Sequence, residues 1–151
     1  YNLEPVELNV LLPRQTMCEK TVSLIRFSMS DTPLASLSSK IRHFYDLDAL
    51  LATEDIQNYI SSKAFAKDIK TLIQHDMQAF DEPIGWSRLE NLSQSPLIKD
   101  FNGLWASLAP KYEENLSSIA YRKIPSSDTI KASFLKILNS LHDIDLKNSK
   151  E

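Results

Sequence analysis

The stretches T-M-C-E-K-T-V-S-L-I-R-F-S-M at residues 16–29 and K-I-R-H-F-Y-D-L-D-A-L-L at residues 40–51 decide the fold of this chain. In both, apolar residues recur every three or four positions, which is the spacing of one helix face. These residues are Cys18, Val22, Ile25 and Met29 in the first stretch, and Phe44, Leu47 and Leu51 in the second. Residues 30–40 between them are rich in Ser, Thr, Asp and Pro, which predicts a loop. We therefore predict two neighbouring amphipathic helices.

The start of the first helix carries a sequence signal for a cap. Thr16 followed by Glu19 has the spacing of a capping box, in which each side chain satisfies a free backbone amide at the helix start. Lys20 then falls in the first turn, where the helix dipole disfavours a cation. An anion bound nearby would compensate for that placement, so Lys20 is a candidate phosphate contact. The alternative is a solvated surface lysine.

The second helix carries charged residues away from its apolar face. Asp46 lies four positions after Arg42, so an ion pair within the helix explains both residues without any ligand. His43 precedes Asp46 by three residues and lies on the same face of the helix.

The first residues of the chain alternate between apolar and polar. Val6, Leu8 and Val10 fall on one side of a period-two pattern, which predicts a short strand closed by Pro13. A lone strand is not stable by itself, so we expect it to pair with another sheet or to lie against the helices.

Beyond residue 51, each polar break is followed by apolar residues at helical spacing. Helix starts are predicted near Thr53, near Ser61 or Ser62, at Ser95–Pro96 and near Ser126 or Ser127. Pro110 predicts a kink or a helix end. The fold class we predict is mainly α, an irregular bundle of about six helices with the short N-terminal strand, and residues 1–151 form a single helical domain.

Composition excludes several classes of protein. Two glycines argue against a fold rich in β-turns, and a net charge of −3 provides no general attraction for nucleic acid. A single cysteine, Cys18, excludes an internal disulfide, and its place on an apolar stripe indicates a buried, unreactive thiol. His43, His75 and His142 are too scattered for a zinc site. No apolar run is long enough to span a membrane, and no signal peptide opens the chain.

Two short motifs resemble those of the AbiEii/AbiGii-type nucleotidyltransferase toxins, the enzyme half of a bacterial defence and toxin–antitoxin system. That family carries T-x-x-E-K, matched here by Thr16, Glu19 and Lys20, and R-x-h-Y-D-L, matched by Arg42–Leu47. The resemblance implies that Lys20 contacts the triphosphate and that Asp46 completes the active site across the cleft. It assigns Arg42 and His43 to nucleotide binding. The family commonly has Asp where this chain has His43.

One part of the family's pattern is missing. Nucleotidyltransferases of this class carry a Gly-Ser turn followed by an Asp-x-Asp pair that binds the catalytic metal, but neither Gly85 nor Gly103 is followed by Ser. Asp-x-Asp occurs at Asp46–Asp48 and at Asp143–Asp145, and neither pair follows a Gly-Ser turn; the second suits a solvated helix end. We therefore expect the C-terminal part of a longer protein, with the N-terminal catalytic domain absent and no metal ligand here.

These observations lead to two functional hypotheses. In the first, the chain is the helical half of a nucleotidyltransferase toxin that moves a nucleoside monophosphate from NTP to an acceptor such as RNA. NTP and Mg²⁺ then act in the full-length cytoplasmic protein, a cognate antitoxin is its partner, and this portion alone is inactive. In the second, the helices form a non-catalytic module that docks an antitoxin or another protein. Lys20 and Asp46 on one wall favour the first hypothesis, and the same two residues facing apart favour the second.

Overall fold

The computed structural model of this chain describes residues 5–80, 82–117, 124–141, 144 and 146. The described residues are mainly helical and contain no strand, so the prediction of a mainly α fold is confirmed. The α-helices are α1 (Pro5–Phe27), α2 (Pro33–Ser38), α3 (Ile41–Leu50), α4 (Glu54–Ile60), α5 (Lys63–Ala79), α6 (Pro96–Lys99), α7 (Phe101–Ser117) and α8 (Ser127–Asn139). Two single 3₁₀ turns, Trp86–Arg88 and Leu92–Gln94, lie between α5 and α6.

Helix α1 begins earlier than the sequence predicted. Residues 5–13, predicted as most of a strand, are helical, and Pro13 lies inside α1 instead of closing a strand. The described residues offer no strand to pair with, and a helix satisfies its own backbone groups where an isolated strand cannot. Proline weakens a helix interior by removing one hydrogen bond, yet here the helix continues through it.

The predicted capping box at the start of this helix is also wrong. Because α1 begins at Pro5, Thr16 is an interior residue and caps nothing. Glu19 instead accepts a hydrogen bond of 3.0 Å from the Gln15 side chain, four residues earlier on the same helix. Lys20 is likewise an interior residue, so the argument from the helix dipole does not apply to it.

Other helix starts follow the sequence closely. The Thr53 hydroxyl caps α4 by accepting a hydrogen bond from the Ile56 amide, and Ser126 caps α8 by accepting one from the Thr129 amide. Ser62 is the residue before α5, as predicted. These starts were predictable because a Ser or Thr stands where a polar break meets an apolar stripe.

Three details differ from the predicted elements. The predicted loop 30–40 contains α2, whose first residue is a proline. The stripe that begins at Ser95 is divided between α6 and α7, and Pro110 lies inside α7 without ending it. The polar connector at 117–127 and the tail after Leu146 fall largely outside the described residues, as do Asp143 and Asp145.

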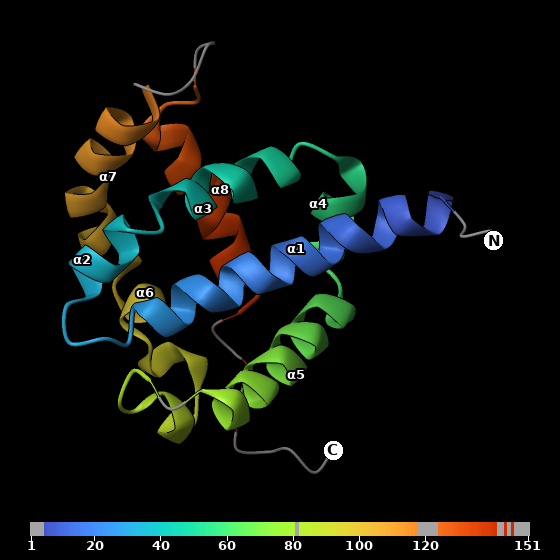
Figure 1. The fold of residues 1–151 in the computed structure, drawn as a ribbon. Helices are drawn as coiled ribbons and strands as arrows, with labels where there is room; N and C mark the ends of the chain where they lie inside the picture. Colours follow the sequence, from blue (N-terminus) through green and yellow to red (C-terminus); the bar gives the residue numbers. More distant parts are fainter. Residues whose placement is uncertain (1–4, 81, 118–123, 142–143, 145, 147–151) are drawn as a thin grey trace.

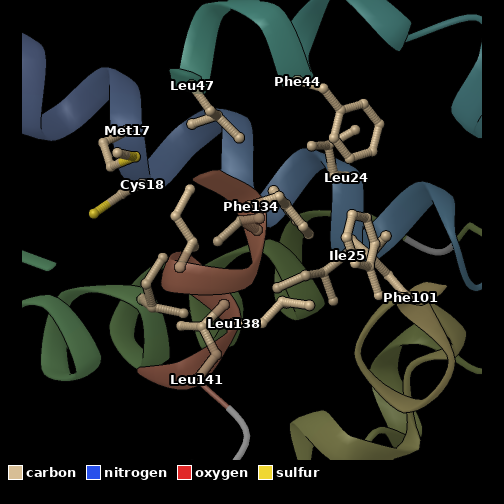
Figure 2. Packing of buried hydrophobic residues seen from close by; sticks show 14 of the residues in the cluster. Met17, Cys18, Leu24, Ile25, Phe44, Leu47, Phe101, Phe134, Leu138 and Leu141 are labelled. Atoms are coloured by element: carbon tan, nitrogen blue, oxygen red, sulfur yellow. The ribbon is translucent and has the colours of Figure 1, made fainter. Parts of the chain in front are cut away.

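Helix α1 runs through the middle of the molecule (Figure 1). It packs against α3 on one side and α5 on the other, while α8 packs against α3. Buried side chains from α1, α3 and α8 meet between these helices, among them Leu24, Phe44 and Phe134 (Figure 2). The helices on either side therefore position α1 relative to α3 and α5.

Candidate functional site: a carboxylate among basic side chains

The two residues singled out in the sequence meet in the structure. Lys20 on α1 and Asp46 on α3 form an ion pair of 3.1 Å between Nζ and Oδ2. The two side chains are 25% and 29% exposed, so the pair lies at the surface without being fully solvated. The structure thus places an ammonium group and a carboxylate from neighbouring helices at one point, as the sequence predicted.

Arg42 joins the same carboxylate from one turn earlier on α3. Its Nε lies 3.9 Å from Asp46 Oδ1, so the two Asp46 oxygens face two different cations. This contact is the ion pair within the helix that was weighed as the ligand-free explanation. Arg42 is 66% exposed, and an exposed pair of this kind contributes at most about 1 kcal/mol to stability.

His43 lies at the edge of this group and is half-buried. Its pKa is lowered from the ordinary value, first by burial and then by the nearby charges of Lys20 and Lys40, while Asp46 acts in the opposite direction. At neutral pH the ring is therefore mostly uncharged, with one nitrogen able to donate and the other to accept a hydrogen bond.

Lys40 extends the group toward the end of α1. Its ammonium nitrogen lies 4.9 Å from the centre of the Phe27 ring, and the Arg26 guanidinium lies 4.9 Å from the same centre. We call Asp46 and the basic residues Lys20, Lys40, Arg42 and His43 the Asp46 cluster. Three permanent cations and one carboxylate give the cluster a surplus of positive charge.

The start of α3 adds to this surplus. No side chain caps its first turn, and no acidic residue lies in that turn. Free backbone N–H groups at a helix start are a common binding site for anions. Lys40, Arg42 and His43 all lie at or next to this start.

Cys18 lies on another side of α1, toward α4. It is 6% exposed, and its sulfur lies 3.2 Å from the Tyr59 hydroxyl. Burial raises the pKa of the Cys18 thiol to about 11, so it stays protonated at neutral pH. The prediction of a buried thiol on an apolar stripe is confirmed, although the stripe alone could not identify Tyr59 as its partner.

The described side chains around the Asp46 cluster do not form a metal site. Among the side chains that the structure describes, no group of three or more His, Cys, Asp or Glu could hold a metal ion. The nearest candidate, Asp46, already faces two cations. The residues described here therefore do not fit a resident Mg²⁺ ion.

Comparison with known families identifies the family of this chain. The family model described as "Nucleotidyl transferase AbiEii toxin, Type IV TA system" matches residues 2–133, which is most of the 151-residue chain. The chain belongs to the AbiEii nucleotidyl transferase toxin family. The resemblance drawn from Thr16–Lys20 and Arg42–Leu47 is thereby confirmed. No curated protein and no solved structure matches the chain.

Membership of the AbiEii family indicates the general class of function, a toxin of a type IV toxin–antitoxin system. A toxin of a type IV toxin–antitoxin system implies a cognate antitoxin as its counterpart. In the described part of the chain, none of the helices has both the length and the apolar character that crossing a membrane requires.

Proposed function

We propose that this chain forms the cationic wall of the NTP pocket of an AbiEii nucleotidyl transferase, with Lys20 as its phosphate contact. One observation carries the proposal: Lys20 and Asp46, from two different helices, meet at 3.1 Å among further basic side chains. A triphosphate carries several negative charges, and the surplus of cations in the Asp46 cluster matches that need. Family membership supplies the class of reaction.

Each residue of the Asp46 cluster has a distinct role in this proposal. Lys20 offsets the charge of the triphosphate, and Asp46 positions Lys20 by accepting its hydrogen bond. Arg42 and His43 contact the nucleotide from the start of α3. Because Arg42 is mostly exposed and 3.9 Å from Asp46, it can turn toward a phosphate without breaking a close contact.

The reaction we propose is transfer of a nucleoside monophosphate from NTP to an acceptor such as RNA. An acceptor oxygen bonds to the α-phosphorus, the bond from that phosphorus to the bridging oxygen breaks, diphosphate leaves, and the acceptor oxygen loses its proton. Reactions of this kind depend mainly on positioning and on charge neutralisation, which lysine and arginine can supply. We assign no step to Asp46 other than holding Lys20.

NTP and Mg²⁺ belong to the full-length protein in this proposal. The carboxylates that hold the metal would come from an N-terminal catalytic domain, which makes this chain inactive alone. The crowding of Asp46 by two cations supports that division of roles, since it leaves the carboxylate little capacity for a metal.

The test is label transfer from NTP by the full-length protein. Lys20→Ala should lower the rate about 100-fold, because removing one preorganised charge from such a site has effects of that size. Asp46→Ala should lower it less, since it displaces Lys20 without removing it. Arg14→Ala is the matched control, another basic residue of α1 in an ion pair, and should leave the rate within about twofold. Transfer at the normal rate in both Lys20→Ala and Asp46→Ala would overturn the proposal.

The alternative hypothesis was a non-catalytic docking module for an antitoxin or another protein. Lys20 and Asp46 facing apart would have favoured it, whereas the two side chains are in contact. The contact supports the enzyme hypothesis, and no other observation favours the docking module.

A further inference from the structure

A hollow of about 430 Å³ lies beside α1, on the side that faces α4 and α5. Its walls include Arg14, Cys18, Glu19, Tyr59, Asp68 and Leu72. Sites for small ligands have volumes of about 300–1,000 Å³ and combine an apolar lining with a few polar groups. This hollow, which we call the α1–α5 hollow, contains neither Lys20 nor Asp46.

A neutral polar group lines the α1–α5 hollow. Tyr59 is only 4% exposed, donates its hydroxyl hydrogen to Asp68, and lies 3.2 Å from the Cys18 sulfur. Burial and the bond to Asp68 raise the pKa of Tyr59, so the hydroxyl stays protonated. The Tyr59 and Cys18 groups therefore bring no charge to the hollow at neutral pH.

The charges around the α1–α5 hollow do not balance. Arg14 lines it, but its guanidinium is neutralised by two hydrogen bonds to Asp55, of 2.7 and 3.1 Å. Glu19 and Asp68 accept hydrogen bonds from neutral side chains, and neither forms an ion pair with any residue in the described part of the chain. Glu19 and Asp68 are both exposed residues; the bond to Asp55 is the main cause of the raised pKa of Arg14, and the charge of Asp68 also acts on Arg14. Because Asp55 already neutralises Arg14, the carboxylates of Glu19 and Asp68 leave an excess of negative charge at the hollow.

We propose that the α1–α5 hollow binds a small organic cation, a protonated amine on a compact apolar body. The ammonium group faces the carboxylates of Glu19 and Asp68, and the apolar body lies against Ala64 and Leu72. Charge complementarity selects the amine, because an anion would meet two like charges there and a neutral ligand would gain no electrostatic attraction from either. This site is separate from the Asp46 cluster and needs no nucleotide.

The test uses phenethylamine as the probe and 2-phenylethanol as its uncharged comparison, titrated into the protein and followed by NMR. The amine should shift the backbone signals of Ala64 and Leu72 and bind at least about threefold more tightly than the alcohol, with the difference shrinking as salt rises. Equal binding of the two probes, or shifts confined to other parts of the molecule, would overturn the proposal.

Two substitutions make the test specific to this hollow. Asp68→Asn keeps an oxygen for Tyr59 but removes the charge, so amine binding should weaken about three- to tenfold. Asp76→Asn on the same helix should leave it unchanged. Ala64→Phe at an exposed position should fill the hollow and abolish binding while the circular dichroism spectrum is retained. Unchanged amine binding in both Asp68→Asn and Ala64→Phe contradicts the assignment.

The same variants separate this inference from the proposed function. Asp68→Asn should transfer label from NTP at the normal rate in the full-length protein, and Lys20→Ala should bind phenethylamine normally. Each proposal can therefore fail while the other stands.

Discussion

Helix α1 forms two ion pairs with other helices, and the two pairs differ in their number of contacts and in the charge around them. Arg14 binds Asp55 through two parallel contacts of 3.1 and 2.7 Å, and its guanidinium also covers the Tyr59 ring at 5.0 Å. Lys20 meets Asp46 through one contact of 3.1 Å. Both pairs join α1 to another helix, so proximity of opposite charges does not distinguish a structural contact from a binding site.

What distinguishes the two pairs is the balance of charge around them. Asp55 faces one cation, and that cation lowers its pKa and fills both of its oxygens. Asp46 faces Lys20 and Arg42, and the charge of Lys40 acts on the neighbouring His43, so the cations outnumber the carboxylate in this cluster. A balanced pair holds helices together, whereas an unbalanced cluster retains attraction for an anion.

The largest effect we expect comes from the core beneath the Asp46 cluster. Phe44 on α3 is 1% exposed, and its ring centre lies 5.1 Å from those of Trp105 and Phe134. Phe44→Ala should lower the free energy of unfolding by about 3–5 kcal/mol, because it leaves a cavity among aromatic rings. Denaturant unfolding measures this loss.

The same variant sharpens the contrast between the two ion pairs. If Phe44 holds α3 in place, Phe44→Ala should increase the hydrogen-exchange rates of the backbone amides of α3. The increase should be larger than that for the amides of α4, which carries Asp55. Ile84→Ala, at a side chain that is 80% exposed, is the control and should change stability by no more than about 0.5 kcal/mol. An equal increase in amide exchange in α3 and α4 would show that both ion pairs depend on the packing of Phe44.

Much of the fold was predictable because local signals decide it. The apolar stripes of α3, α5 and α8 and the polar residues Thr53 and Ser126 before two helices depend only on nearby sequence. The strand prediction for residues 5–13 failed because a period-two pattern of a few apolar residues does not exclude a helix. Tertiary contacts decide between helix and strand for such a segment, and the elements described around it are helices.

The Asp46 cluster was predictable only in part. Lys20 and Asp46 were chosen through a family resemblance, and the dipole argument that supported Lys20 used a helix start that does not exist. The hydrogen bonds among Cys18, Tyr59 and Asp68 left no trace in the sequence, because they join three helices whose packing no spacing rule predicts. Contacts between helices require the tertiary structure.

A smaller effect, limited to a range of pH, should come from His43. Its pKa is lower in the folded protein, so the unfolded chain takes up a proton first as the pH falls. The stability that His43 contributes is present above its unfolded pKa of about 6.5 and is lost as the pH falls through the folded pKa. Between about pH 7 and pH 5, the wild type should lose stability that His43→Gln keeps, as urea unfolding at each pH would measure.

His75→Gln controls for the loss of an imidazole, since the side chain of His75 is 76% exposed. Burial is the first cause of the lowered pKa of His43, and the positive charges of Lys20 and Lys40 add to it. A steeper loss of stability in His43→Gln than in the wild type as the pH falls would contradict this lowered pKa.

The smallest effect should come from the Lys20–Asp46 pair itself, and its asymmetry is informative. Removing Lys20 takes away one attraction to Asp46 but also relieves repulsion from Arg42, which faces the same carboxylate, so Lys20→Ala should change stability little. Asp46→Asn leaves the cations without their carboxylate and should destabilise the protein by about 0.2–1 kcal/mol, less at high salt. Added inorganic phosphate should recover part of that loss, because an anion bound only by the folded state stabilises it. If Lys20→Ala were instead the more harmful change, Asp46 would be the group in excess, and the cluster would be a structural contact like that of Arg14 and Asp55.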